Sequence, residues 1–289
     1  MKRTFNSHER KEANGLWAFF ILTYALMLLT WGIMAVFQMR AAAATDTGAP
    51  PSAFGMVLFL LGGFSPTIAG AIMAWRVQGR DGLRDLWKRS VQFRLGGVWY
   101  LAILGLPLLV RGLQAVAFAL RGGGFVEPPF VAQPVSLIGF TIMMFLFGPV
   151  SEEFGWRGFA LDRLLARQNA LRAGLILGVL WACWHLLLFF IPGTAQQQMG
   201  NPVPMFTGFA VEVVAMSVLF TWLYVNTARS IWGVILFHMA LNYTNNLLFM
   251  VTGGTVGLAT HLTGTVGLVA LAVTVAAVYG TNLQRGQHG

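Results

Sequence analysis

Long apolar runs with few charges determine what this chain can fold into. Eight of them approach the ~20 residues that an α-helix needs to cross a bilayer, at positions 15–37, 54–75, 98–120, 135–163, 173–191, 204–225, 231–250 and 256–280. Only 10% of the 289 residues are charged, whereas soluble domains are nearer ~25%. We therefore predict an all-α, polytopic membrane protein of about eight transmembrane helices, forming one integral membrane domain over residues 1–289.

The basic residues are distributed unevenly across the predicted membrane. With the N-terminus inside, most of the 19 Lys and Arg fall on the inner side, among them Lys2, Arg3, Arg10, Lys11 and Arg285. The outer loops hold only Arg40 and Arg121, and Arg111 lies within a span. This asymmetry follows the positive-inside rule and predicts a plasma (inner) membrane protein with both termini cytoplasmic. The net charge of +9 is accordingly expected to face anionic lipid, and no nucleic-acid partner is expected.

Residues 80–94 combine apolar and basic side chains at helical spacing. Leu83, Leu86, Trp87 and Val91 share one helical face, and basic residues line the opposite face. This pattern predicts an interfacial helix on the inner leaflet. A merely basic loop is the alternative.

Two adjacent carboxylates, Glu152 and Glu153, follow the apolar part of the fourth span. Ionisable residues within membrane segments are rare, costly and commonly functional. On a helix, Glu153 and Arg157 are one turn apart and are expected to pair. Glu152 points ~100° away from Glu153 and stays free for chemistry. The alternative is that both glutamates are solvated at a helix end.

Three further polar residues lie in other spans: His185 in the fifth, and His238 and Asn242 on one face of the seventh. A lone histidine in an apolar helix is more often structural than catalytic. Counted along each helix from the nearest inner-side basic residue, however, Glu152, His185 and His238 lie at similar depths of ~14–20 Å. Intramembrane polar groups face the protein interior or a wet cavity, so we expect convergence on a site reached from the inner side.

Such a cluster has the parts for hydrolysing an amide or an ester. Glu152 in an apolar pocket can act as a general base on water, and His185 can hold that water and shuttle its proton. His238 and Asn242 can donate hydrogen bonds to a developing oxyanion. Alternatively, Glu152, His185 and His238 form a three-ligand zinc site with an open water position. Sequence spacing leaves the metal-bound and metal-free versions open.

The order of these residues resembles the CPBP family, which includes the type II CaaX prenyl endopeptidases, their bacterial relatives and proteins linked to bacteriocin processing and self-immunity. The matching motifs are Glu152-Glu153-x-x-x-Arg157, Trp181-x-x-x-His185 and His238-x-x-x-Asn242, with a Pro-kinked second span at Gly63-Phe64-Ser65-Pro66. The resemblance covers about residues 54–250. Trp181 is a departure, because the family usually has phenylalanine there, and we expect it to affect local packing rather than chemistry.

The resemblance implies an eight-helix intramembrane endopeptidase that acts on membrane-associated or lipidated peptides. Its catalytic roles fall on Glu152, His185, His238 and Asn242, with Glu153 and Arg157 in support. The family is commonly labelled metal-dependent, although a glutamate-based, metal-free mechanism has been argued for it. Two other functions remain open, a proton-coupled membrane transporter and a catalytically silent immunity or scaffold protein.

Arg111 and Glu212 are each the only charge deep within their spans, and both lie in the outer half of the predicted membrane. Their similar depth predicts a buried ion pair between the third and sixth spans. Its role would be structural, because a buried charge without its partner is strongly destabilising.

Overall fold

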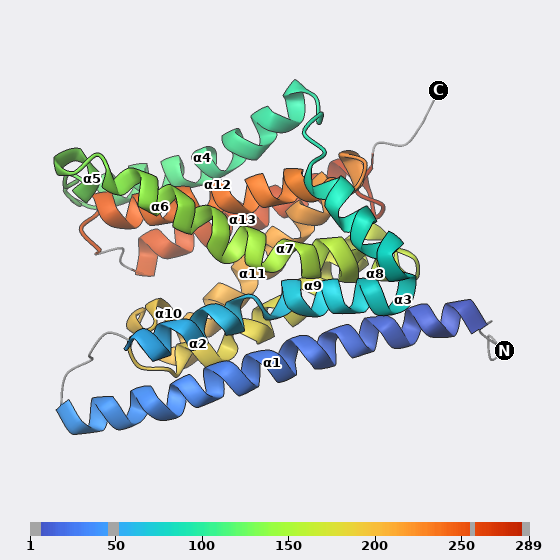
Figure 1. Cartoon of the computed structure of the whole chain (residues 1–289). Helices are drawn as coiled ribbons and strands as arrows, with labels where there is room; N and C mark the ends of the chain where they lie inside the picture. The colour runs from blue at the N-terminus through green and yellow to red at the C-terminus, as the bar shows by residue number, and fades with distance from the viewer. Residues whose placement is uncertain (1–6, 46–51, 255–257, 285–289) are drawn as a thin grey trace.

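The computed structural model describes residues 7–45, 52–254 and 258–284, and every regular element within these ranges is a helix (Figure 1). Seven helices in the described ranges are long and apolar enough to cross a membrane, or eight spans result if one bent pair counts as one. The predicted all-α polytopic membrane fold is therefore confirmed. Lys2, Arg3 and Arg285, which contributed to the predicted orientation, lie outside the described residues.

The spans follow the predicted apolar runs. They are α1 (Ser7–Thr45), the bent pair α2 (Ala53–Gly63) and α3 (Ser65–Ser90), α4 (Gly97–Leu120), α9 (Ala170–His185), α11 (Pro202–Asn226), α12 (Ile231–Val251) and α13 (Leu258–Tyr279). The fourth span is a composite of α6 (Ser136–Phe145), the π-helical turn η1 (Leu146–Val150), α7 (Ser151–Gly155), the π-helical segment η2 (Trp156–Leu161) and α8 (Asp162–Leu165). Short helices complete the fold: α5 (Pro129–Ala132), η3 (Leu186–Phe189) and α10 (Ala195–Gln198).

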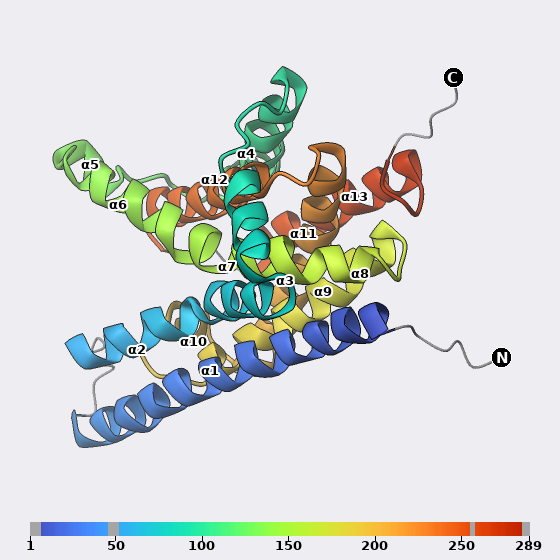
Figure 2. The ribbon, with the colours of Figure 1, turned by 45° about the vertical axis from the view of Figure 1, so that its right-hand side comes forward.

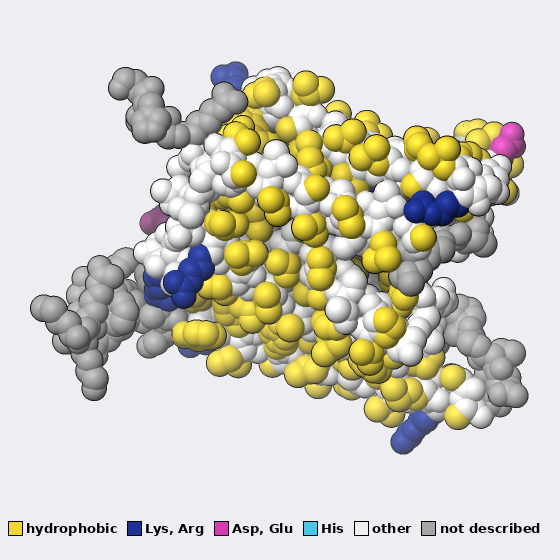
Figure 3. All heavy atoms as spheres, turned by 180° about the vertical axis from the view of Figure 1, so that it is seen from behind, with side chains coloured by type: hydrophobic (Ala, Val, Ile, Leu, Met, Phe, Trp, Pro, Cys, Tyr) yellow, Lys and Arg dark blue, Asp and Glu magenta, His cyan; other side chains and the backbone are white. Residues whose placement is uncertain are grey.

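The connections between helices gather at two ends of the molecule. One end contains α8, the end of α3 and the turn before α12, and we call it the arginine end because it holds Arg84, Arg89, Arg163, Arg167 and Arg229 (Figure 1). The opposite end contains α5 and α10. Figure 3 shows a broad hydrophobic flank with Lys and Arg at its margins. An apolar belt between polar ends is the surface that a bilayer requires.

The second span bends where the sequence predicted a kink. α2 and α3 are inclined by 45°, and Pro66 lies in the first turn of α3. The indole of Trp31 donates to a backbone carbonyl of α2 at 3.0 Å, and that of Trp184 donates to Ser65 Oγ at 3.1 Å. Side chains of α1 and α9 therefore hold both arms of the bend.

The helix predicted from residue 80 is present as the last part of α3. Gly79 has a positive φ of 63° and interrupts the helical backbone, and the helix then continues to Ser90. Trp87 is 66% exposed, as a lipid-facing residue would be. The prediction that the basic residues line an exposed face is wrong for Arg89, which is buried. Its charge is compensated inside the protein by Asp85 and Asp162.

Two glycines let α3 and α7 touch backbone to backbone. A Cβ on Gly70 would lie 2.7 Å from Cα of Gly155, and a Cβ on Gly155 would overlap the backbone carbonyl of Pro66. Only a residue without a side chain permits this approach. The contact seats α7, with its two glutamates, directly against α3.

The predicted direct ion pair between Arg111 and Glu212 is not formed. Both residues are buried, but Arg111 Nη1 donates to Gln114 Oε1 at 2.5 Å and Glu212 Oε1 accepts from Thr265 Oγ1 at 2.8 Å. The reason is that α13, which carries Thr265, packs against both α4 and α11 and separates them. The two charges still interact electrostatically at longer range.

Candidate active site

Glu152 is buried in α7, and tryptophans hold one of its two carboxylate oxygens. Its Oε2 atom accepts hydrogen bonds from the indole Nε1 of Trp181 at 2.5 Å and of Trp156 at 3.3 Å. Indole N–H groups are donors only, so the carboxylate is oriented without being neutralised by a cation in direct contact. Within the described residues, Oε1 has no hydrogen-bond partner, which leaves that oxygen for a water molecule or a substrate.

Glu153 points elsewhere, as helical geometry predicted. Arg157 Nη1 donates to its two carboxylate oxygens at 2.9 and 3.1 Å, and neither side chain is exposed. The guanidinium lies 4.4 Å from the ring centroid of Trp181 and 4.3 Å from that of Phe220. The expected i,i+4 pair is thus confirmed. It is also desolvated between two aromatic faces, where charge–π attraction adds to the ion pair.

His238 of α12 is the second partner of Glu153. Its Nδ1 atom lies 2.7 Å from Glu153 Oε1, and because a carboxylate can only accept, Nδ1 carries the proton. The remaining ring nitrogen, Nε2, faces Gly148 in η1. A Cβ added to Gly148 would lie 3.2 Å from that Nε2 and 2.7 Å from Asn242 Nδ2. Gly148 also has a positive φ of 101°, so a residue without a side chain is required beside these two polar groups.

His185 of α9 completes the group. Its Nδ1 atom lies 2.9 Å from the carbonyl oxygen of Trp181 and therefore donates to it, which leaves Nε2 with a lone pair. The Trp181 ring centroid lies 5.9 Å from that of His185 and 5.5 Å from that of His238. The indole of Trp181 thus lies beside both histidines and also contacts Glu152. The predicted convergence of the fourth, fifth and seventh spans is present in the structure.

The metal-binding alternative does not fit this arrangement. A zinc ion needs its protein ligands at about 2 Å from a common point, and no group of three or more His, Cys, Asp or Glu side chains within the described ranges is so placed. Hydrogen bonds through Nδ1 leave the Nε2 atoms of His185 and His238 open, but the three predicted ligands do not converge on one point in the described structure. We therefore derive the chemistry from the side chains of the protein alone.

Sequence reasoning missed two features of this site. Trp181 was expected to change only packing, yet its Nε1–H contacts Glu152 directly, which phenylalanine is unable to do. Nothing in the sequence indicated that Gly148 lies beside the polar residues of the site. Its place in Phe147-Gly148-Pro149, one turn before the glutamates, was the available hint, because glycine before proline within an apolar helix marks a break.

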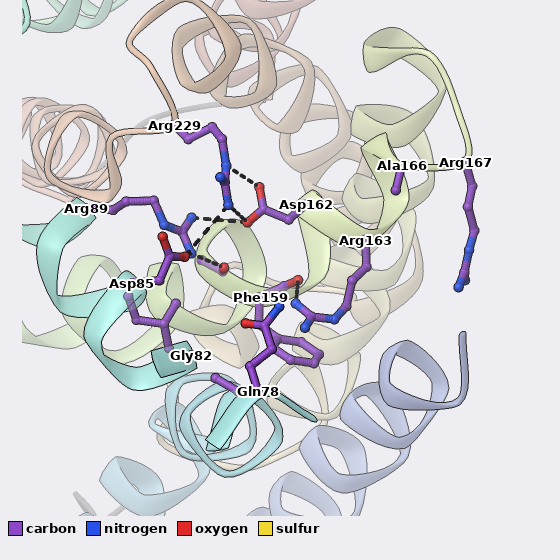
Figure 4. Close-up of a pocket in the computed structure, with 13 residues that line it drawn as sticks. Gln78, Gly82, Asp85, Arg89, Phe159, Asp162, Arg163, Ala166, Arg167 and Arg229 are labelled. Carbon is purple, nitrogen blue, oxygen red and sulfur yellow. Dashed lines mark hydrogen bonds and ion pairs between the residues drawn. The ribbon is translucent and has the colours of Figure 1, made fainter. Parts of the chain in front are cut away.

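A second group of charged residues lies at the arginine end, around a cavity of about 280 Å³ (Figure 4). Asp162 accepts from Arg229 Nε at 3.0 Å and from the hydroxyl of Tyr224 at 2.6 Å. Arg89 lies 2.7 Å from Asp85 and 3.3 Å from Asp162. Hydrogen bonding to Asp162 raises the pKa of Arg229, so this charge is permanent. We call Asp85, Arg89, Asp162 and Arg229 the arginine clamp. It joins α3, α8 and the turn before α12.

Comparisons with known proteins find similarity over the part of the chain that carries the three motifs. The profile of the family described as type II CAAX prenyl endopeptidase, Rce1-like, matches residues 134–244, a range that contains all three motifs. A curated relative, CAAX prenyl protease 2 of Methanococcus maripaludis, is 24% identical over 197 residues, which cover 67% of this chain and 73% of the relative. Taken with three motifs on three packed spans, these matches show that the chain is similar to the Rce1-like type II CAAX prenyl endopeptidases.

Proposed function

We propose that the protein is an intramembrane endopeptidase that hydrolyses a peptide bond with water activated by Glu152. The observation that supports this proposal most directly is the environment of the Glu152 carboxylate. It is buried in a transmembrane span, one oxygen accepts from two indoles, and the other has no partner in the described structure. Such a group is positioned to take a proton from water, which is the first requirement of general-base hydrolysis.

The reaction then follows from the placement of the neighbours. Water bound between Glu152 and Nε2 of His185 gives its proton to the carboxylate, and its oxygen forms a bond to the peptide carbonyl carbon. Asn242 Nδ2 donates to the resulting oxyanion. The C–N bond breaks as Glu152 returns the proton to the leaving amine. His238 contributes a second donor when Nε2 is protonated, and Arg157 holds Glu153 as the fixed acceptor for the other ring nitrogen.

We propose a membrane-associated peptide as substrate, with a prenylated C-terminal segment as the class that the family match supports. The bilayer itself is the obligatory partner. The charge distribution supports a plasma (inner) membrane with both termini cytoplasmic.

Purified protein in proteoliposomes tests this proposal with paired peptides that differ only in a farnesyl group on one cysteine. Glu152→Gln is expected to slow hydrolysis by about 10²–10⁴-fold, the usual contribution of general-base catalysis. The matched control is Cys183→Ser, since Cys183 is exposed and lies outside the contacts of the site. Equal processing by wild type and Glu152→Gln would show a catalytically silent polar core, and preference between the peptides reports the substrate class.

Chelation gives a separate test of the chemistry. Because no three ligands converge within the described residues, we expect activity and bound-metal content to be uncorrelated after treatment with a strong chelator. Loss of activity that one specific metal restores would contradict the mechanism written above.

A further inference from the structure

The cavity at the arginine end lies in a bend of α3 (Figure 4). Gly79 has a φ of 63°, which residues with a side chain rarely adopt, and Figure 2 shows α3 turning toward α4 beyond this point. The lining residues on α3 come from both sides of the bend: Ala74 and Gln78, then Gly82, Asp85, Leu86 and Arg89. The cavity volume of about 280 Å³ is close to the lower limit of ~300 Å³ for pockets that hold small molecules.

The cavity lining changes from apolar to charged toward the arginine end. On the wall opposite α3, Phe159, Arg163 and Arg167 line it at spacings of four residues along η2 and α8. Phe159 is buried and Arg167 is exposed. α3 repeats this order, since the buried Ala74 lies one turn before the exposed Gln78. An apolar floor below a charged rim matches the boundary between the hydrocarbon core of a bilayer and its headgroups.

The cavity lining also carries an excess of positive charge. It contains four arginines and two aspartates, which leaves a formal excess of two positive charges. The arginine clamp accounts for two arginines and both aspartates, and these pair with one another. The other two arginines, Arg163 and Arg167, lie on α8. Arg167 has no carboxylate partner among the described residues, so its charge is available to an anionic ligand.

The depth of the cavity in the membrane indicates which anion it meets. Trp87, on the same part of α3, is 66% exposed, and tryptophan is enriched where the bilayer meets water. With the arginine end cytoplasmic, as proposed above, the cavity faces the leaflet that is rich in anionic lipid. Basic pockets between transmembrane helices on that side bind lipid head groups. The anion at this depth is therefore the phosphate group of a lipid.

We infer that this cavity binds the phosphate group of an anionic glycerophospholipid, with Arg163 and Arg167 as its cationic partners. Arg163 is held in place because it donates to the carbonyl oxygen of Phe159 at 3.1 Å and lies 3.6 Å above the ring of the same residue. Guanidinium groups bind phosphate through paired, charge-assisted hydrogen bonds. On the other wall, the side-chain amide of Gln78 makes no hydrogen bond to any described residue and supplies a neutral donor.

The apolar floor of the cavity favours a lipid over a free phosphate ion. Ala74 and Phe159 offer no hydrogen-bonding group to an ion, whereas they contact the glycerol and the first chain carbons of a lipid. The bound lipid connects α3 to α8, and α3 also packs on the segment that carries the two glutamates at Gly155. A ligand that binds only the folded state stabilises it. Lipid binding does not require peptidase activity and stands apart from the proposed function.

Thermal unfolding of the full-length protein in a neutral detergent tests the class of ligand. We expect phosphatidylglycerol to raise the melting temperature in a saturable manner. Phosphatidylcholine is expected to raise it much less, because its own choline neutralises the phosphate, and inorganic phosphate at the same concentration should have little effect. An equal shift with inorganic phosphate would show a site for free anions and overturn the lipid assignment. Equal shifts with the two lipids would overturn the role of the positive charge.

Arg167→Gln and Arg172→Gln form a matched pair that tests the location. Both arginines are exposed and lie close together in sequence, but only Arg167 lines the cavity. Arg167→Gln is expected to weaken the binding of phosphatidylglycerol about tenfold, because charge-assisted hydrogen bonds to phosphate are lost. Arg172→Gln should change it less than about twofold, and Arg167→Lys should fall between Arg167→Gln and wild type. Equal losses in the two glutamine variants would show a general attraction to surface charge and contradict a specific site.

Ala166→Trp provides a second variant, which leaves every arginine in place. Ala166 lines the cavity and is exposed, so a larger side chain can fill the cavity from its rim without entering the core. We expect this variant to lose the shift caused by phosphatidylglycerol while its melting temperature without lipid stays near that of the wild type. If Ala166→Trp and Arg167→Gln both bind the lipid with wild-type affinity, the lipid binds elsewhere and the inference is wrong.

Discussion

The two halves of this molecule differ in how their polar side chains are paired within the membrane. Near the arginine end, charges are paired: Arg157 with Glu153, and the members of the arginine clamp with one another. Near the opposite end, polar side chains such as Asn245 have no described partner. Paired charges stabilise a fold, because each compensates the desolvation of the other, whereas unpaired amides leave hydrogen-bonding capacity for something else. The contrast indicates that the half near the arginine end serves as scaffold.

The largest difference in unfolding free energy is expected when one arginine in each half, Arg157 or Arg121, is replaced by methionine. Arg157→Met leaves Glu153 buried beside His238 without its cation, and the loss in unfolding free energy should be about 3–5 kcal/mol. Arg121→Met, at the exposed end of α4, should leave thermal unfolding in detergent unchanged. The double variant Glu153→Met/Arg157→Met should recover part of the loss. Equal melting temperatures for the two single variants would remove the distinction between the halves.

Two acids, the half-buried Asp162 and the buried Glu212, give the next comparison. Asp162→Asn removes a charge that contacts Arg89 and Arg229, and hydrogen bonds to charged groups contribute about 1.5–3 kcal/mol. Glu212→Gln keeps an oxygen for Thr265 and has no cation in contact, so a smaller loss is expected. Unfolding by heat in the same detergent measures both. A greater effect of Glu212→Gln would show that its longer-range interaction with Arg111 matters more than contact distance indicates.

Alanine substitutions at two glycines, one tightly packed and one with open space around it, test how closely α3 and α7 approach each other. Gly155→Ala places a Cβ against the backbone of Pro66, and overpacking of this kind costs about 1–3 kcal/mol. Gly112→Ala in α4 meets no neighbouring atom and should stabilise the helix by about 0.4–1 kcal/mol. Opposite shifts in melting temperature are therefore expected. If both variants were stabilised, the close approach of α3 and α7 would be in error.

The smallest expected change in stability is at Trp181, where the two halves meet. Trp181→Phe keeps an aromatic ring beside Arg157 but removes the N–H that contacts Glu152. Because Trp156 still donates to the same oxygen, the loss in unfolding free energy is expected to be at most about 1.5 kcal/mol. Because the carboxylate loses its orientation, kcat should fall more than KM changes. A variant with wild-type kcat would mean that the hydrogen bond from Trp156 alone orients Glu152.

Much of the candidate site was predictable because helical periodicity is local. The spacing of Glu153 and Arg157 fixes their pairing within one helix, and the shared depth of Glu152, His185 and His238 followed from counting residues along straight spans. The same reasoning did not extend to Arg111 and Glu212. Equal depth does not specify which helices are neighbours, and α13 lies against both of theirs.

The sequence by itself determined the class of protein, the position of each span and the residues that carry the motifs, because hydrophobic length and helical period depend only on residue order. The tertiary structure decided which contacts those residues make. In the folded protein the indole of Trp181 donates a hydrogen bond to Glu152, and His238 hydrogen-bonds to Glu153. Arg89 is buried and pairs with a carboxylate. These outcomes depend on how helices distant in sequence pack around glycines and aromatic rings, which no single span encodes.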